Sequence, residues 1–270
     1  MPAVQLAILN QQINGLTSHF ADPVSFRHEV EGLLLRYSDL SYKPGQAVYQ
    51  SNLSLSSYRT APVVMRRLQQ HMSGLASLNP ELALPAADEL WRSDQTEMRQ
   101  LAAVALGNVP IPYANRVFER LKTWPTPGTK LAQLEALFEK GSTQIRKENP
   151  QQWLDQTRAW LNDTDVNINR LGVIAMLPLA NDPTYENLPA IFNALNPVLL
   201  TMVAELQLEL RKLLTVLAHR SPTETGYYLR QVMGINASRT MLRLVRRILP
   251  EFPEEIQTKL RIALASQQHK

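Results

Sequence analysis

Residues 160–183 read WLNDTDVNINRLGVIAMLPLANDP, a stretch with the features of one amphipathic helix. Asp163 or Thr164 is a suitable N-cap, and the acid that follows them would favour the positive end of the helix dipole. Apolar residues recur at helical spacing until Pro178, which ends or kinks the helix. Arg170 lies in the first half of this helix. Because a guanidinium cannot be buried alone, it must reach an acid, a carbonyl or a phosphate.

The same helical spacing of apolar residues continues through almost the whole chain, punctuated by proline more than by glycine. The alternation of Val, Ile and Thr that is typical of strands is missing. The sequence therefore predicts an all-α protein. The expected helices cover residues 4–19, 23–37, 61–75, 84–91, 96–106, 113–122, 130–139, 151–161, 166–177, 188–195, 197–207, 210–218, 223–232, 237–249 and 253–265.

A weak internal repeat organises these helices into pairs. Arg99, Arg211 and Arg239 are each followed eleven residues later by a proline, and Arg170 begins a looser copy. Such a pattern can arise by chance, but it is also typical of a HEAT-like solenoid, a curved superhelix of antiparallel helix pairs. We expect a single helical-repeat domain over residues 1–270. Its expected parts are an N-terminal hairpin (1–40), a polar loop (38–57), a HEAT-like array (55–250) and a C-terminal helix (251–270).

The composition excludes several kinds of site. The chain has no cysteine, and its five histidines lack ligand spacing, so we expect no metal. No glycine-rich phosphate loop is present among its ten glycines, so we expect no nucleotide cofactor, nor any other. The N-terminus does not resemble a signal peptide, and no apolar run reaches transmembrane length. The expected location is therefore the cytoplasm, with no membrane partner.

Positive charge is concentrated in residues 211–250, which contain eight basic residues and one acid within a chain of net charge +4. Four of these form an arginine stripe at helical spacing: Arg239, Arg243, Arg246 and Arg247. Like charges this close destabilise an isolated helix, so a polyanionic partner is a reasonable inference. Arginine also suits phosphate, which its planar fork can bind through two hydrogen bonds. A solvated helix face and an acidic protein partner are the alternatives.

Four short segments resemble the bacterial DNA alkylation repair family, the AlkD-like HEAT-repeat alkylpurine DNA glycosylases. They occur in the family's order and together extend over about residues 55–250. The segments are YRTAPVVMRRLQ (58–69), ELWRSDQTEMRQLAAVAL (89–106), residues 160–176 and ELRKLLTVLAHRSP (209–222).

The resemblance implies a basic concave groove that holds duplex DNA. In that family an aspartate flanked by tryptophans stabilises the cationic sugar as an N-alkylated base departs, and a cleft arginine grips the backbone. The position of that arginine matches Arg170. We therefore expect the DNA-binding residues to be Arg170, Arg211, Lys212, Arg239, Arg243, Arg246 and Arg247.

The sequence departs from the family at the catalytic carboxylate. No aspartate occurs between residues 95 and 154, and an aromatic residue expected after Lys212 is replaced by Val216. Glu135, one methylene longer than aspartate, is the candidate catalytic residue on the corresponding helix. It could instead be a solvent carboxylate paired with Lys130 or Arg146, and the chain a non-catalytic relative.

The four tryptophans divide into core and cleft candidates. Trp91 lies in an apolar context that favours the core, and the spacing of Trp153 and Trp160 also favours the core over the cleft. Trp124, ahead of a Pro-Thr-Pro-Gly turn, is the best candidate for an exposed aromatic that stacks on a base. Trp160 is the second base-stacking candidate.

Two functions follow from these features. The first is a HEAT-like protein that binds duplex DNA, alkylated or unmodified, through a basic concave face, and that either retains or has lost N-alkylpurine excision. The alternative is a helical-repeat scaffold that binds other proteins and has no nucleic-acid role.

Overall fold

The computed structural model describes residues 5–38, 56–201 and 204–267. This part of the chain consists of helices, turns and one isolated bridge between Ser56 and Gln95. The prediction of an all-α protein is confirmed. The loop predicted over residues 38–57 lies almost entirely outside the described residues. None of the described helices combines the length and the apolar character that crossing a membrane requires.

The chain divides into two compact units, which are described separately below. Unit 1 comprises residues 1–124 and 136–149, and unit 2 comprises residues 125–135 and 150–270. The boundary falls inside helix α7 (Leu131–Gly141). The single array expected over residues 1–270 stays a prediction.

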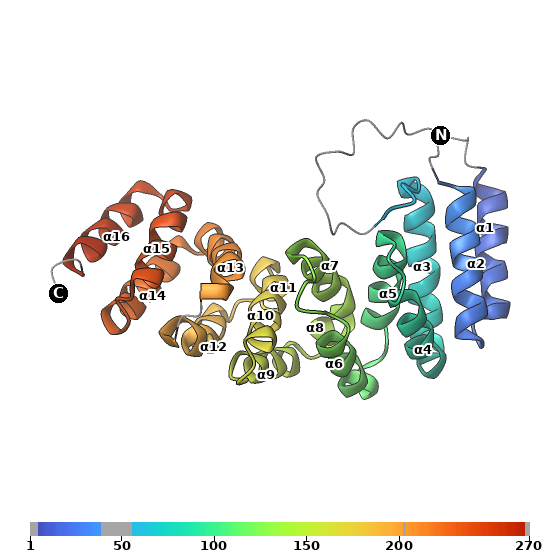
Figure 1. Ribbon diagram of the computed structural model, residues 1–270, viewed down its shortest axis with the longest axis horizontal. Coiled ribbons are helices and arrows are strands. Elements are labelled where there is room, and N and C mark those ends of the chain that lie inside the picture. Colours follow the sequence, from blue (N-terminus) through green and yellow to red (C-terminus); the bar gives the residue numbers. More distant parts are fainter. Residues whose placement is uncertain (1–4, 39–55, 202–203, 268–270) are drawn as a thin grey trace. The chain divides into compact units, whose positions relative to one another are not determined.

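Unit 1 is built from two layers of helices (Figure 1). In one layer α1 packs on α3 and α3 on α5; in the other α2 packs on α4, and α4 covers both α3 and α5. The α-helices of this unit besides the end of α7 are α1 (Leu6–Gly15), α2 (Pro23–Arg36), α3 (Pro62–Leu78), α4 (Pro80–Trp91), α5 (Thr96–Gly107), α6 (Ala114–Thr123) and α8 (Thr143–Glu148).

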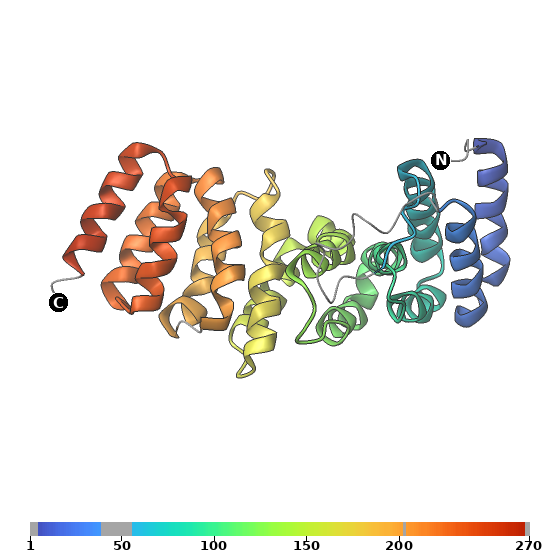
Figure 2. The same ribbon diagram turned by 45° about the horizontal axis from the view of Figure 1, so that its top comes forward.

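Unit 2 also has two layers, whose helices run side by side in Figures 1 and 2. One layer contains α9, α12, α14 and α16, and the other contains α10 with α11, α13 and α15. The helices of this unit are α9 (Pro150–Leu161), α10 (Val166–Ala175), α11 (Leu177–Asn181), α12 (Leu188–Thr201), α13 (Gln207–Arg220), α14 (Pro222–Ile235), α15 (Arg239–Ile248) and α16 (Glu254–Ser266).

The helix of the opening stretch begins and ends close to where its sequence indicates. Its N-cap is Asp165, whose side chain accepts a hydrogen bond of 2.8 Å from the Asn167 amide, rather than Asp163 or Thr164. The helix breaks at Met176, and α11 follows directly with Pro178 in its first turn. Proline therefore kinks this segment, because it has no N–H to continue the hydrogen-bond ladder.

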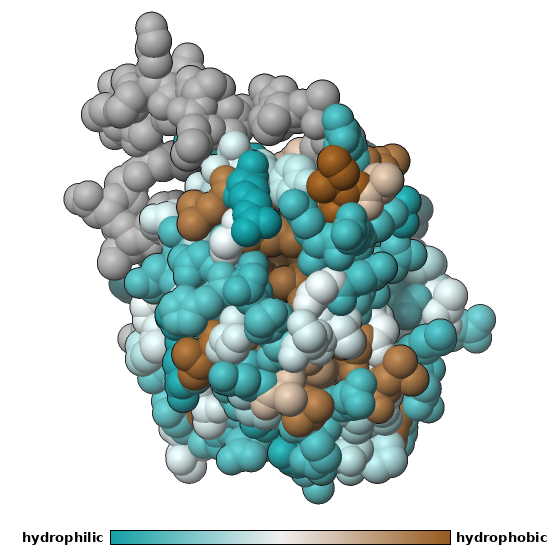
Figure 3. Space-filling model, turned by 90° about the vertical axis from the view of Figure 1, so that its right-hand side faces the viewer, coloured by the Kyte–Doolittle hydropathy of each residue, from teal (hydrophilic) through white to brown (hydrophobic). Residues whose placement is uncertain are grey.

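The outer side of the first two helices is only partly polar. Figure 3 views the molecule from the side on which α1 and α2 lie, and hydrophobic side chains are scattered there among hydrophilic ones. Four large apolar residues of these helices are between 46 and 51% exposed: Leu6, Ile8, Val24 and Leu35. Isolated exposed apolar residues are normal on a protein surface.

Gly107 at the end of α5 makes the tightest backbone approach in unit 1. A Cβ atom at this position would lie 1.7 Å from the Lys140 carbonyl oxygen. We expect Gly107→Ala to lower the free energy of unfolding by about 3 kcal/mol, because backbone on both sides must move. Gly74→Ala in α3 is the matched control: no atom lies within 4 Å of its added Cβ, so it should stabilise by about 0.5 kcal/mol. Urea denaturation measures both, and equal effects would contradict the close packing.

Candidate nucleic-acid interface

The predicted cations of unit 2 fall on one layer of helices. Arg170 lies on α10, Arg211 and Lys212 lie on α13, and the arginine stripe lies on α15. Helix α13 packs against both α10 and α15. Three of the four recurring arginines, Arg170, Arg211 and Arg239, are therefore carried by neighbouring helices of the same layer, whereas Arg99 lies on α5 of unit 1.

The arginine stripe occupies the solvent side of α15. All four of its side chains are exposed, as are Arg211 and Lys212 on α13. The opposite side of α15 is buried and consists of Met241, Leu242, Leu244, Val245 and Ile248.

The stripe has no acidic counterpart. Among the described residues, no carboxylate forms an ion pair with any of its four guanidinium groups. Arg247 Nη1 donates to the Gln207 Oε1 atom of α13 over 3.4 Å, which links the two helices through a neutral group. Residues four apart on a helix are separated by about 6 Å along its axis, so these cations repel one another. A bound polyanion would relieve that repulsion.

Arg170 is engaged inside the protein. Its Nε atom donates to Glu209 Oε1 over 2.7 Å, and its Nη1 atom donates to the Pro127 carbonyl oxygen over 3.2 Å. The Glu209 side chain is 3% exposed and that of Arg170 is 19% exposed. Of the partners that the sequence allows for this guanidinium, the structure supplies an acid and a carbonyl. The phosphate contact predicted for Arg170 would use its remaining N–H groups.

Glu135, the candidate catalytic residue, lies next to one of the predicted DNA-binding residues. Its Oε2 atom is 3.6 Å from Lys212 Nζ, and both side chains are partly exposed. The alternative partners considered from the sequence were Lys130 and Arg146. Arg146 donates to the Ser142 hydroxyl and to the Glu139 carbonyl.

Trp160 is a core residue, as its spacing with Trp153 favours, and its choice as the second stacking candidate is wrong. Its side chain is 2% exposed and meets Trp153 edge to face, with ring centroids 6.1 Å apart. Trp153 is fully buried and donates its indole N–H to the Ala175 carbonyl. The ring of Trp160 therefore has no face open to a base.

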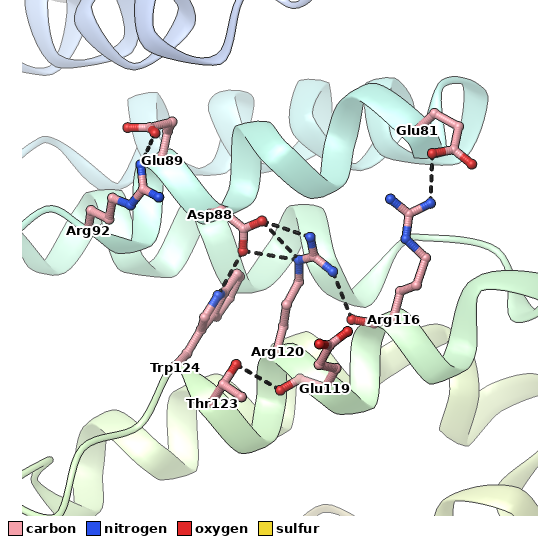
Figure 4. Close-up of polar contacts among 9 residues, drawn as sticks. All are labelled: Glu81, Asp88, Glu89, Arg92, Arg116, Glu119, Arg120, Thr123 and Trp124. Atoms are coloured by element: carbon pink, nitrogen blue, oxygen red, sulfur yellow. Dashed lines mark hydrogen bonds and ion pairs between the residues drawn. The ribbon is translucent and has the colours of Figure 1, made fainter.

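Trp124 belongs to a polar and aromatic cluster in unit 1 (Figure 4). Its ring stacks on Trp91, with centroids 4.9 Å apart and an interplanar angle of 12°. The Trp124 indole N–H donates to Asp88 Oδ1 over 2.9 Å. Asp88 also accepts hydrogen bonds from Arg120. The Nε atom donates to Oδ1 over 3.0 Å, and the Nη2 atom donates to Oδ2 over 2.7 Å. The side chain of Asp88 is 31% exposed and that of Arg120 is 16% exposed.

Sequence reasoning missed Asp88 and Arg120. The resemblance places the aspartate within residues 95–154, whereas Asp88 lies before this range, 36 residues before Trp124. No spacing rule connects the two, because Asp88 is on α4 and reaches Trp124 through the packing of α4 against α6. The only signal available was Asp88 itself, the first of two successive acids, three positions before Trp91.

The fold and the basic layer of unit 2 define an all-α helical-repeat protein with a cationic surface. The family model of the DNA alkylation repair enzymes matches residues 63–245, more than half of the chain. The protein belongs to this family. Searches of the curated proteins and of the solved structures found no match.

Proposed function

We propose that the protein binds duplex DNA through the exposed cations of α13 and α15. We call these six residues the basic surface: Arg211, Lys212, Arg239, Arg243, Arg246 and Arg247. The observation that carries the proposal is the arginine stripe, whose four exposed guanidinium groups share one side of α15 and pair with no carboxylate of the described residues. Because the chain belongs to a DNA alkylation repair family, nucleic acid is favoured over other polyanions as the partner of this surface.

The chemistry of the basic surface fits phosphate better than base edges. Arginine forks bind phosphate oxygens through two hydrogen bonds, and such contacts carry no sequence information. Binding should therefore be independent of sequence and strongly dependent on salt, since each neutralised phosphate releases condensed counterions.

We further propose that duplex binding proceeds without efficient base excision. Excision of a cationic base needs a carboxylate close to the developing sugar cation. Glu135 lies beside Lys212, which neutralises it, and Asp88 has both oxygens bonded to Arg120 and Trp124. The absence of an aspartate from residues 95–154 supports the same conclusion.

A titration of fluorescently labelled duplex tests the binding proposal. The slope of log affinity against log salt should be steeper than about −3, because at least four phosphates would be neutralised at about −0.9 each. The same titration with polyglutamate as competitor addresses the alternative of an acidic protein partner. A slope near zero, or displacement of the duplex by polyglutamate at equal charge concentration, would contradict the proposal.

A duplex containing N7- or N3-methylpurine tests the second proposal. We expect no free base above the rate without protein. Release of free base that disappears in Glu135→Gln would instead assign catalysis to Glu135.

The Glu135–Lys212 pair makes a separate prediction for binding. Glu135→Gln should raise duplex affinity about two- to fivefold, because it removes a negative charge from the basic surface and frees Lys212 for phosphate. Glu255→Gln is the matched control, since Glu255 pairs with Lys259 on α16 in the opposite layer. Fluorescence anisotropy at fixed salt measures both variants. Weaker binding by Glu135→Gln would show that this carboxylate assists the interaction.

A further inference from the structure

Hydrogen bonds hold Trp124 at both its side chain and its backbone. Its N–H donates to Asp88, and its backbone carbonyl accepts the indole N–H of Trp91 over 3.0 Å. One ring face is covered by Trp91, whose ring also has the Arg99 guanidinium 4.9 Å from its centroid. The Trp91 ring thus contacts both the Arg99 guanidinium and the Trp124 ring, all within unit 1.

The Asp88 carboxylate, which accepts the Trp124 N–H, is itself held in place by Arg120. Arg120 binds both of its carboxylate oxygens, and Arg120 Nη1 also donates to the Arg116 carbonyl over 3.0 Å. Figure 4 shows this guanidinium lying between the Asp88 carboxylate and the backbone of α6. A two-point pair of this kind sets the direction of the carboxylate as well as its distance. The oxygen that receives the Trp124 N–H therefore has a fixed position.

We propose that Asp88 and Arg120 are positioning residues that hold the Trp124 ring as a stacking platform for an unpaired nucleobase. The proposal rests on the proposed binding of nucleic acid but concerns a different set of residues. Trp124 is half-buried, and Trp91 is its only aromatic partner among the described residues. A ring that is already ordered loses little freedom when a base stacks on it. Every base has a flat face, so this platform is tolerant of sequence.

This arrangement assigns Asp88 a structural role. Both of its carboxylate oxygens accept hydrogen bonds from the Arg120 guanidinium, and one of them also accepts the Trp124 N–H. Asp88 acts through Trp124, and only the indole would touch the base.

Tryptophan fluorescence tests the platform directly. Trp153 and Trp160 are buried, so quenching by a single-stranded oligothymidylate should report on Trp124 and its neighbour Trp91. We expect Trp124→Ala to weaken oligothymidylate binding about tenfold, the effect of losing one base–aromatic stack. Asp88→Asn should weaken it by a similar factor, and so should Trp124→Phe, which keeps an aromatic ring but loses the N–H that donates to Asp88.

A second ion pair between the same two helices is the matched control. Glu81 of α4 binds Arg116 of α6 over 2.6 Å and does not touch Trp124. Glu81→Gln should leave both quenching and affinity unchanged. The near-ultraviolet circular dichroism of the stacked tryptophans should fall in Asp88→Asn and stay intact in Glu81→Gln, which separates a loss of ring position from a loss of helix packing.

Two results would overturn the proposal. One is oligothymidylate binding that is the same in Trp124→Ala and the wild type. The other is an equal loss of the circular dichroism signal in Asp88→Asn and Glu81→Gln. Anisotropy of a labelled duplex, measured on the same samples, reports the basic surface of unit 2 separately, so failure of one proposal is distinguishable from failure of the other.

Discussion

Reversing the charge of Arg243, Arg246 and Arg247 to glutamate is expected to abolish duplex binding. At 100 mM salt the affinity should fall by at least about 100-fold, and the slope against log salt should become shallower by about three. The physical reason is twofold: three phosphate contacts are lost, and three new carboxylates repel the DNA backbone. Because all three side chains are exposed and the buried side of α15 is untouched, the fold should be retained.

The control for this triple variant carries the same charge change on the other layer of unit 2. Arg230, Lys259 and Arg261 are exposed on α14 and α16, away from the layer of α10, α13 and α15. Their reversal breaks two exposed ion pairs with glutamates, at a cost of under about 1 kcal/mol each. We expect affinity to fall less than about fivefold. An equal loss in both triple variants would indicate a response to net charge, and no loss in either would remove the proposed interface.

Most helices were predictable because each is decided by nearby residues, but α8 was missed, and the break expected before Pro197 lies inside α12. Apolar spacing, the kink at Pro178 and an acid near the start of α10 are all local, and the structure moves the N-cap only to Asp165. The exposure of the arginine stripe was predictable for the same reason. The four arginines and the apolar residues between them occupy opposite sides of one short helix, so no knowledge of distant residues is needed.

Contacts between distant residues were not predictable from those patterns. Arg170 and Glu209 are 39 positions apart, and Lys212 and Glu135 are 77 apart, so neither pair has a spacing signal. The spacing of Trp153 and Trp160 favours the core for Trp160 but does not identify the residues that cover its ring. Only the packing of α9 against its partners decides that it is buried.

The four segments that carry the family resemblance are joined in pairs by two buried glutamates. Glu97 accepts hydrogen bonds from the Ser57 hydroxyl and from the Tyr58 and Arg59 amides, which connects the segments 58–69 and 89–106. Glu209 binds Arg170 and so connects the other two. Buried carboxylates need such partners, and changing one segment alone would leave the other with an unpaired charge. The motifs therefore reflect contacts that hold each unit together more directly than they reflect a catalytic reaction.

Arg170→Ala is expected to destabilise unit 2 by about 3–5 kcal/mol. The Glu209 carboxylate is 3% exposed, and its Oε2 atom already lacks a hydrogen-bond partner, so removal of Arg170 leaves a buried charge without compensation. Replacing both residues, as in Arg170→Met with Glu209→Leu, should restore most of the stability, because apolar residues of similar volume need no partner. Urea denaturation of the two single variants and the double variant gives the coupling energy.

The double variant also isolates any contact of Arg170 with phosphate. If Arg170 contacts a DNA phosphate, the double variant loses that contact even though its fold is restored. Its slope of log affinity against log salt should then be shallower than that of the wild type by about one. An unchanged slope would assign Arg170 to the architecture of unit 2 alone. A loss below about 1 kcal/mol in Arg170→Ala would contradict the structural role, since that is the range of an exposed ion pair.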